Sequence, residues 1–444
     1  MSRLTRNQAT KARKRSPKVT FEKTGKNMTS KAGLIPVIKF LDKLGFHNLF
    51  KKTVDHQRKP NSLYSLDDGV FMVIVGIIGG AFSLSKCAQL WSGCEVIQKI
   101  AGWVSVPDET TLGRIFKSLK DRHVSQMETF IHSIRNRVWE KANIVLTSDL
   151  WIDVDSSVKT VYGNQEGAEK GFNSHKRGAL SYHPLLAFAT HTKEILQGWL
   201  RSGNAYTSNG VLEFMKQLLA QLDGNQRIIF RGDSGFFVGE LMDHLDSLGH
   251  GYLIKVKMKN LVNLLVQQEW EPIPGKPGWE SCQFWHCASS WNVGRMLVAV
   301  RREKSREASL LSAIVDKVDY DFFCYATTEN LTPWETHKKY GQRATSETWI
   351  EEAKNQSGLA HMKTSEFLAN AGLFQSAILA YNTLRWMALM SNNKELQQWE
   401  PMTIRVHLIC VAGKLKTGSN QNKVVLPKHH LYSTAWDDWL KLAA

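Results

Sequence analysis

Two apolar, β-branched stretches that carry aspartates constrain the fold of this chain most strongly. The first reads NIVLTSDLWIDVDSSV at residues 143–158, and its Asp153 and Asp155 lie two apart, so they share one face if the stretch is a strand. The second reads QRIIFRGDSGFF at residues 226–237, with Asp233 where the strand pattern gives way to Gly and Ser. Neighbouring strand ends would gather these carboxylates into one site.

The segments around these stretches predict an α/β fold with a mixed sheet. A Gly-rich loop follows the first strand and leads into two more strand patterns that end near residue 200. A helical pattern at residues 209–222, the Asp233 strand, a helical pattern at residues 240–248 and the strand pattern GYLIKVKMK complete the order β-β-β-α-β-α-β. We expect residues 143–259 and 331–400 to form this core.

A third acidic position lies in the segment KKYGQRATSETWIEEAKNQ at residues 338–356. Tyr340, Arg343, Glu347 and Lys354 read Y-x2-R-x3-E-x6-K, and at about 100° per residue they fall within roughly 60° around a single helix. One carboxylate between two cations and a phenol makes a poor packing face. It makes a good clamp for a metal ion and a phosphodiester.

This spacing resembles the signature of bacterial insertion-sequence transposases of the cut-and-paste type, which have an Asp-Asp-Glu catalytic triad. The resemblance implies a ribonuclease-H-like core in which Asp155, Asp233 and Glu347 are catalytic and bind two Mg²⁺ ions, with Mn²⁺ as a substitute. Such ions activate the attacking water or 3′-hydroxyl and stabilise the leaving oxygen. Hard oxygen ligands suit Mg²⁺.

The same resemblance assigns Tyr340, Arg343 and Lys354 to contacts with the DNA strand end. It implies double-stranded DNA as the partner, namely the terminal inverted repeats of a mobile element and the target DNA. Because two ends must be cut and joined together, a homodimer on paired ends is expected.

The choice between the two early aspartates rests on the residues that follow them. The family's first motif is usually Asp, a small hydroxyl residue and Thr, and Asp155-Ser156-Ser157 fits with Ser in place of Thr. Asp155 is therefore the predicted ligand, and Asp153 is a candidate for a supporting role in the same pocket. An Asp at a strand end is more often a turn or cap residue, but the ordered triad with its Tyr-Arg-Lys companions favours catalysis.

Positive charge is concentrated at the start of the chain. The net charge is +16, and the first 60 residues contain 16 Lys and Arg against 3 Asp and Glu, a balance of +13. We expect residues 1–30 to be a flexible basic arm that binds DNA, with Lys11, Arg13, Lys14 and Arg15 as candidate contacts. A disordered solubilising tail is the alternative.

Residues 31–142 have helical patterns and are predicted to form an N-terminal DNA-binding domain. Pro107 and Asp108 with two threonines form an N-cap region before an amphipathic run that carries Arg114 and Lys117. This run is a candidate helix of a helix-turn-helix motif. A plain helical bundle is the alternative, and the resemblance to transposases favours DNA binding.

A further 114 residues separate Asp233 from Glu347, far more than a strand and a linker need. Residues 260–330 are alternating, aromatic-rich and punctuated by Pro and Gly, which predicts a small inserted β domain. Family members with such an insertion use it to hold a hairpinned strand end with an aromatic ring on a flipped base. Trp285 and Trp291 are the candidates here, although each Trp alone is more often a core residue.

Several classes of protein fit poorly. The basic N-terminus lacks an apolar signal core, the apolar run at residues 70–82 is too short to cross a bilayer, and the cysteines form no C-x2-C pair. Cys282, His286 and Cys287 form only a weak zinc candidate. We expect a cytoplasmic, nucleoid-associated bacterial protein. The C-terminal segment 401–444 begins with a strand-like pattern, MTIRVHLICVAGKL, and ends in an amphipathic stretch.

The predicted function is a DNA transposase that binds terminal inverted repeats, cleaves the element's ends and joins the 3′-hydroxyls to target DNA. Hairpin ends are implied by the resemblance and by the insertion. Two alternatives stay open. One is a metal-dependent nuclease or resolvase on the same core, and the other is a transposase-derived DNA-binding protein without catalysis.

Overall fold

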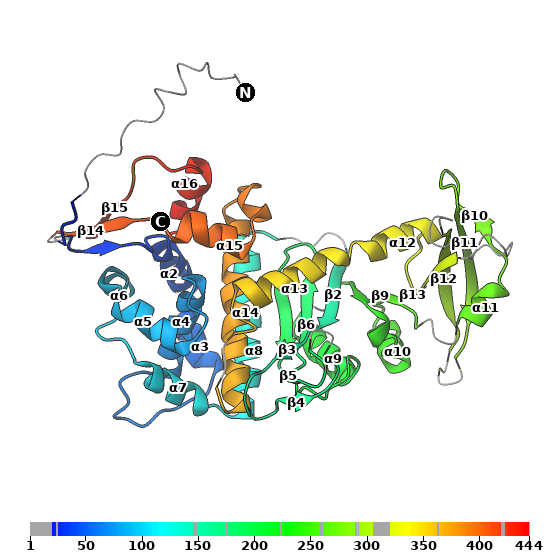
Figure 1. Cartoon of the computed structure of the whole chain (residues 1–444), viewed down its shortest axis with the longest axis horizontal. Helices are drawn as coiled ribbons and strands as arrows, with labels where there is room; N and C mark the ends of the chain where they lie inside the picture. Colours follow the sequence, from blue (N-terminus) through cyan, green and yellow to red (C-terminus); the bar gives the residue numbers. More distant parts are fainter. Residues whose placement is uncertain are drawn as a thin grey trace, which may run out of the picture.

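The computed structural model of the chain describes most of its length, with helices to one side and a large sheet to the other (Figure 1). The described residues are 20–23, 25–144, 149–173, 176–222, 224, 226–257, 261–288, 291, 293–304, 320–361, 364–418 and 422–443. Residues Lys11, Arg13, Lys14 and Arg15 of the predicted arm lie outside them.

The large sheet is mixed, as the sequence predicts. Its strands are β2 (Leu150–Ser156), β6 (Leu185–Ala189), β7 (Ile195–Trp199), β8 (Ile228–Gly232), β9 (Gly251–Lys255), β10 (Glu271–Pro272), β11 (Trp279–His286), β12 (Arg295–Glu303) and β13 (Tyr320–Thr327). They lie in the order β10-β11-β12-β13-β9-β8-β2-β6-β7, in which β2–β8 and β8–β9 are parallel. With helices α9 (Val211–Gln221) and α10 (Gly239–Ser247), the strands of this sheet follow the predicted succession β2, β6, β7, α9, β8, α10, β9. The predicted Gly-rich loop between β2 and β6 differs, because it contains a separate small sheet of β3 (Lys159–Thr160), β4 (Glu169–Lys170) and β5 (Leu180–Tyr182).

The strands of the insertion extend this sheet instead of forming a second one. β13 pairs antiparallel with β9, with Tyr325 opposite Lys255 and Thr327 opposite Leu253. This pairing satisfies the backbone groups that β9 would otherwise expose as an edge strand. The inserted segment, with α11 (Val262–Val266), therefore continues the core sheet towards the right of Figure 1.

Residues 31–142 are helical, as predicted. The helices are α2 (Leu34–Lys43), α3 (Phe46–Thr53), α4 (Leu66–Ile78), α5 (Leu84–Ser92), α6 (Glu95–Ala101), α7 (Glu109–Lys117) and α8 (Asp121–Lys141). Asp108 caps α7 by accepting a hydrogen bond from the Thr111 amide at 2.6 Å, at the predicted N-cap. Much of the apolar run at residues 70–82 lies in α4 and is buried. Within the described residues, no helix is long and apolar enough to span a membrane.

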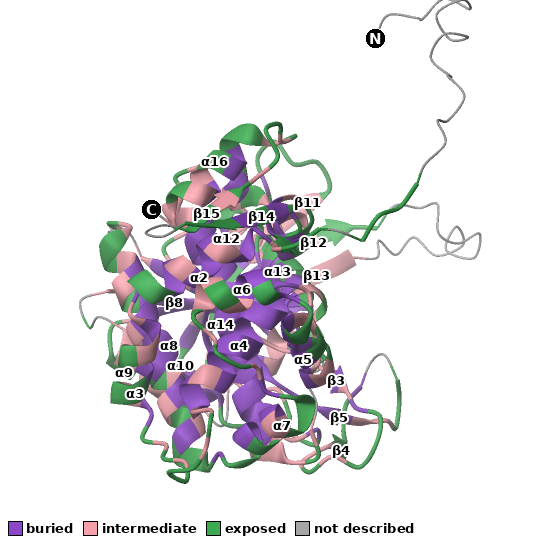
Figure 2. Ribbon diagram, turned by 90° about the vertical axis from the view of Figure 1, so that its left-hand side faces the viewer, coloured by how far each residue is buried: buried purple, intermediate pink, exposed green. Residues whose placement is uncertain are grey.

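Helix α14 (Phe367–Met390) joins the helical part to the sheet. It is apolar on all sides, so it lies in the interior, and one hydrophobic core combines its residues with those of α2, α4, α8 and β6. Figure 2 shows buried residues concentrated along α4, α8 and α14. Polar side chains of α14 hydrogen-bond to the backbone of the edge strand β7. Asn382 both donates to and accepts from the Ile195 backbone at 2.8 Å, and Gln375 donates to the Gly198 carbonyl at 2.7 Å.

The two ends of the chain depart from the sequence predictions. β1 (Met28–Thr29) pairs with β14 (Gly413–Thr417), so residues 28–29 belong to a small sheet with β15 (Asn422–Val425) and not to a free arm. The strand-like pattern at residues 402–415 is a strand only at its end, where it enters β14; its first part is α15 (Pro401–Ile404) followed by a π-helical turn, Arg405–Ile409. Tertiary contacts explain this: buried Arg405 donates to the carbonyls of Ile78 and Gln356. The amphipathic end forms α16 (Ser433–Lys441).

Candidate catalytic site

The three predicted catalytic carboxylates line one cavity of about 470 Å³. They come from different parts of the chain: Asp155 from β2, Asp233 from the residue after β8, and Glu347 from α13 (Ala344–Gln356). The full lining is Asp155, Ser156, Ser157, Val158, Phe172, His183, Thr207, Asp233, Glu347, Ile350, Glu351 and Lys354.

The sheet positions the first two carboxylates. β2 and β8 are parallel neighbours with Val154 opposite Gly232, so Asp155 and Asp233 follow at the same end of adjacent strands. Asp233 also starts a short 3₁₀ turn, and its carboxylate accepts a hydrogen bond from the Gly235 amide at 2.8 Å. The local structure therefore fixes both carboxylates on the cavity lining.

Arg343 lies between two of these carboxylates. Its guanidinium is 2.8 Å from Asp155 Oδ2 and 3.2 Å from Glu347 Oε1. The Arg343 side chain is 8 % exposed and that of Glu347 is 62 % exposed, so the cation is buried behind the two carboxylates, outside the cavity lining, while the Glu347 carboxylate reaches solvent. Burial raises the pKa of Asp155 to about 6; Arg343 opposes this shift, and the neighbouring carboxylates of Asp233 and Glu347 add to it.

The signature segment is not the single helix that the spacing predicts. It consists of α12 (Pro333–Gly341) and α13, which are separated at Gln342 and Arg343. The backbone amide of Arg343 donates to the Tyr340 carbonyl, and the backbone amide of Ser346 donates to the Arg343 carbonyl, each at 2.9 Å. Because these bonds join residues three apart, the turn is wound more tightly than an α-helix. Tyr340 therefore packs on Tyr325, with ring centroids 4.8 Å apart, and burial raises the pKa of the Tyr340 phenol to about 12.

Asp153 has a different environment from Asp155. Both of its carboxylate oxygens accept hydrogen bonds from Arg231, at 2.5 and 2.8 Å, and both side chains are almost fully buried. Arg231 also donates to the Lys339 carbonyl at the end of α12. Asp153 is absent from the cavity lining. Through Arg231 it joins β2 to β8 and α12.

Lys354 and Glu351 also line the cavity, and Glu351 is not among the residues predicted from the sequence. Lys354 lines it and forms an ion pair with Glu351 at 3.3 Å. Glu351 follows Glu347 by four residues, a spacing that places both on one helix face and could have identified it. Thr207, which bonds to Ser156 at 3.1 Å, comes from a loop that no local sequence signal marks, and His183, just before β6, is buried at the cavity.

The predicted base-stacking residues do not line this cavity. Trp285 is the second-last residue of β11 and is 71 % exposed. Trp291 packs against Phe237, with ring centroids 5.2 Å apart, and under the Arg295 guanidinium at 4.8 Å. Trp291 thus anchors the insertion to the segment before α10, and its ring already has partners.

The two cations predicted to contact DNA from α7 have intramolecular partners. Arg114 donates to the Thr111 hydroxyl at 3.0 Å. Lys117 lies 3.1 Å from both the Ser365 hydroxyl and the Glu366 carboxylate, just before α14. The Arg114 contact lies within α7, and the Lys117 contacts join α7 to the start of α14.

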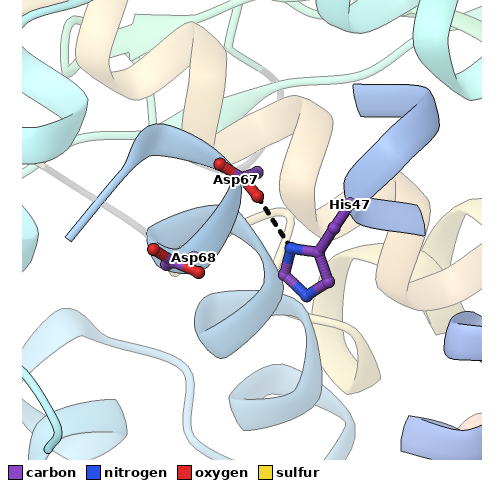
Figure 3. Close-up of side chains that lie close together, drawn as sticks. All are labelled: His47, Asp67 and Asp68. Atoms are coloured by element: carbon purple, nitrogen blue, oxygen red, sulfur yellow. Dashed lines mark hydrogen bonds and ion pairs between the residues drawn. The ribbon is translucent and has the colours of Figure 1, made fainter. Parts of the chain in front are cut away.

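Another group of potential metal ligands lies in the helical part. His47, Asp67 and Asp68 each offer a ligand atom within 4.8 Å of the others, the one group so tightly gathered in the part of the chain that the structure describes. Figure 3 shows the His47 ring facing Asp67, at 2.8 Å. Asp67 is also 3.5 Å from Lys51, and Asp68 caps α4 through Ser65, so helix packing accounts for the group. The weak zinc candidate around Cys282 does not form such a group among the described residues.

Asp155, Asp233 and Glu347 suit a divalent cation by their chemistry. They offer hard carboxylate oxygens to one cavity. Burial and the neighbouring negative charges raise the pKa of Asp155, and a bound cation would offset both effects by favouring the ionised carboxylate. Arg343, bonded to two of them, shows that this position favours positive charge.

Comparison with known proteins gives one family. The family model described as "Transposase DDE domain group 1" matches residues 11–443. Among solved structures, the chain is similar to a piggyBac transposase synaptic complex with hairpin DNA, with a TM-score of 0.42 and 12 % identity, covering 84 % of this chain and 85 % of that chain. None of the curated proteins matches the chain in sequence.

Proposed function

Because the chain belongs to the transposases with a DDE domain, a family that generally uses divalent metal ions, we propose that it cleaves the DNA ends of a mobile element and joins them to target DNA. The proposal includes membership of the bacterial insertion-sequence group with the Tyr340, Arg343, Glu347 and Lys354 signature. It also includes terminal inverted repeats as the substrate.

One observation carries this proposal. Asp155, Asp233 and Glu347, which lie far apart in the sequence, line a single cavity together with Lys354. The strand order β7-β6-β2-β8-β9 supports a ribonuclease-H-like core, because β2 lies at its centre with one antiparallel and one parallel neighbour. Asp155 is favoured over Asp153, since Asp153 is committed to Arg231.

The three carboxylates would hold Mg²⁺, or Mn²⁺ in its place. When bound, two such ions activate the attacking oxygen and stabilise the leaving oxygen in an in-line displacement at phosphorus. Lys354 offers its ammonium group to a nonbridging phosphate oxygen from the cavity wall. Arg343 keeps Asp155 and Glu347 in place and offers positive charge to the phosphodiester.

The remaining elements of the proposal concern assembly. A dimer on paired ends would allow both ends to be cut and joined in one complex. Hairpin ends would account for the long insertion between β9 and α12, which brings four strands beside the core. The basic residues before residue 20 would bind DNA phosphates outside the core.

A nuclease or resolvase without strand transfer is the second candidate. The same cavity would serve it, because hydrolysis and strand transfer differ only in the attacking hydroxyl. A DNA-binding protein without catalysis is disfavoured because all three acidic positions are filled and line one cavity.

The test compares Glu347→Gln with Glu351→Gln. Both carboxylates line the cavity and lie on one face of α13, but only Glu347 contacts Arg343 beside Asp155. With Mg²⁺ and DNA carrying the inverted repeats that flank the gene, Glu347→Gln should abolish cleavage and keep DNA affinity, whereas Glu351→Gln should retain cleavage. Equal activity of the wild type and Glu347→Gln would refute the proposal. Products without joined target DNA would favour the nuclease.

A further inference from the structure

An exposed aromatic ring stands on the wall of the catalytic cavity. Phe172 is 74 % exposed, yet it lines the same cavity as Asp155, Asp233 and Glu347. Most of the other lining side chains are polar or charged. The ring is therefore free to contact a ligand that enters the cavity.

The residues on either side of Phe172 are firmly anchored. Gly171 lies so close to the backbone of another loop that a Cβ atom there would come within 1.9 Å of the Gly203 carbonyl oxygen. Asn173 is buried, and its amide donates to the Thr160 hydroxyl at 3.0 Å. Two fixed neighbours thus present an exposed ring between them, so little conformational freedom is lost when a ligand covers it.

The position of this ring suits an unpaired nucleobase. Every base has a face that stacks on an aromatic ring, and stacking of this kind tolerates any sequence. We propose that Phe172 stacks on an unpaired base of the DNA strand end whose phosphate lies among Asp155, Asp233 and Glu347. This inference rests on the proposed function, because that function brings a strand end into the cavity.

Phe172 is better placed for this role than either tryptophan of the insertion. Trp285 is equally exposed but does not line the cavity, and Trp291 is covered by Phe237 and Arg295. In the part of the chain that the structure describes, Phe172 is the only Phe, Tyr or Trp on the cavity lining.

The test measures binding to two labelled duplexes, one blunt and one with a short single-stranded oligothymidine 3′ overhang. Both are measured by fluorescence anisotropy with Mg²⁺ in the Glu347→Gln background, so that neither DNA is cut. Phe172→Ala should weaken binding of the overhang duplex by about 5- to 150-fold, which corresponds to the stacking of one base. Binding of the blunt duplex should change less than about twofold. Phe172→Trp should retain the affinity of the parent.

A chemical readout separates stacking from a general loss of affinity. Permanganate oxidises unstacked thymines, so saturating parent protein should protect an overhang thymine that Phe172→Ala leaves reactive. Equal overhang affinity and equal protection in the parent and in Phe172→Ala would overturn the inference. Loss of both on Trp285→Ala, with Phe172→Ala unaffected, would overturn it in favour of the insertion.

Failure of the inference and failure of the proposed function give different results. If the wild-type protein cuts element-end DNA with Mg²⁺ but Phe172→Ala binds the overhang normally, the stacking role is wrong and the transposase proposal stands. If the wild type does not cut that DNA, the proposed function fails, whatever the overhang affinities are.

Discussion

Replacing Asp153 by Asn is expected to destabilise the fold, whereas the same change at Asp155 is not. Asp153 and Arg231 form a doubly hydrogen-bonded ion pair with side chains only 1 % and 2 % exposed. Removing one partner of such a pair leaves a buried charge without compensation and costs about 3–5 kcal/mol. Arg231 cannot escape this cost by losing its proton.

The expected change in melting temperature follows from the size of the chain. At about 2.1 cal/mol/K per residue, cooperative unfolding of 444 residues has an entropy near 0.9 kcal/mol/K. A loss of 3–5 kcal/mol therefore lowers the Tm by about 3–5 °C. Differential scanning calorimetry at pH 7 measures this directly.

Asp155 should behave in the opposite way. Its pKa is raised in the folded state, to about 6, so its contribution to stability is present below the unfolded value near 3.8 and is lost as the pH rises through 6. At pH 7 Asp155 is mostly ionised, and keeping that charge buried costs stability relative to the unfolded state. Arg343 would still have Glu347 as a partner, so Asp155→Asn should leave the Tm unchanged or raise it while abolishing cleavage. A Tm loss at Asp155→Asn as large as that at Asp153→Asn, or no loss at Asp153→Asn, would refute this assignment.

Three further outcomes are expected. Deleting residues 1–19, which contain seven Lys and Arg and precede β1, should weaken DNA binding and flatten its dependence on log salt by up to about 0.9 per lost phosphate contact; an unchanged slope would show a passive tail. The rate of cleavage should fall as the pH is lowered through about 6, because protonated Asp155 is a poor metal ligand, and a constant single-turnover rate down to pH 5 would contradict this. Trp291→Ala should cost up to about 3 kcal/mol in denaturant unfolding because its ring is packed, whereas exposed Trp285→Ala should cost almost nothing.

The sequence predicts best those features that depend on local patterns. Alternation and β-branched runs identify β2 and β8, and the aspartates at their ends meet because adjacent parallel strands end together. The N-cap at Asp108 is equally local. The helical form of residues 401–409 depends instead on Arg405, which is buried against carbonyls more than 300 residues away in sequence, so local propensity gives the wrong element.

Local sequence patterns do not predict the parts of the site that depend on contacts between distant segments. His183, Thr207 and Phe172 reach the cavity through loops whose course is set by close backbone contacts, such as that of Gly171 with Gly203. The partner of Asp153 could not be read from its spacing either, since Arg231 is aligned with it only by the register of β2 and β8. Their spacing puts Asp153 and Asp155 on one face of the strand, but Asp153 is buried in an ion pair with Arg231, whereas Asp155 lines the cavity.

The signature segment shows why spacing can identify a site without giving its geometry. The 100° rule places Tyr340, Arg343, Glu347 and Lys354 on one stripe only if the helix is continuous. In the fold the turn after Gly341 has i→i+3 hydrogen bonds, at about 120° per residue, so Tyr340 on α12 packs towards Tyr325. Glu347 and Lys354 remain in register because both belong to α13, and Arg343, at the junction, turns towards Asp155 of β2. The tight turn thus allows one short segment to contact the insertion with its first residue and the catalytic strand with its second.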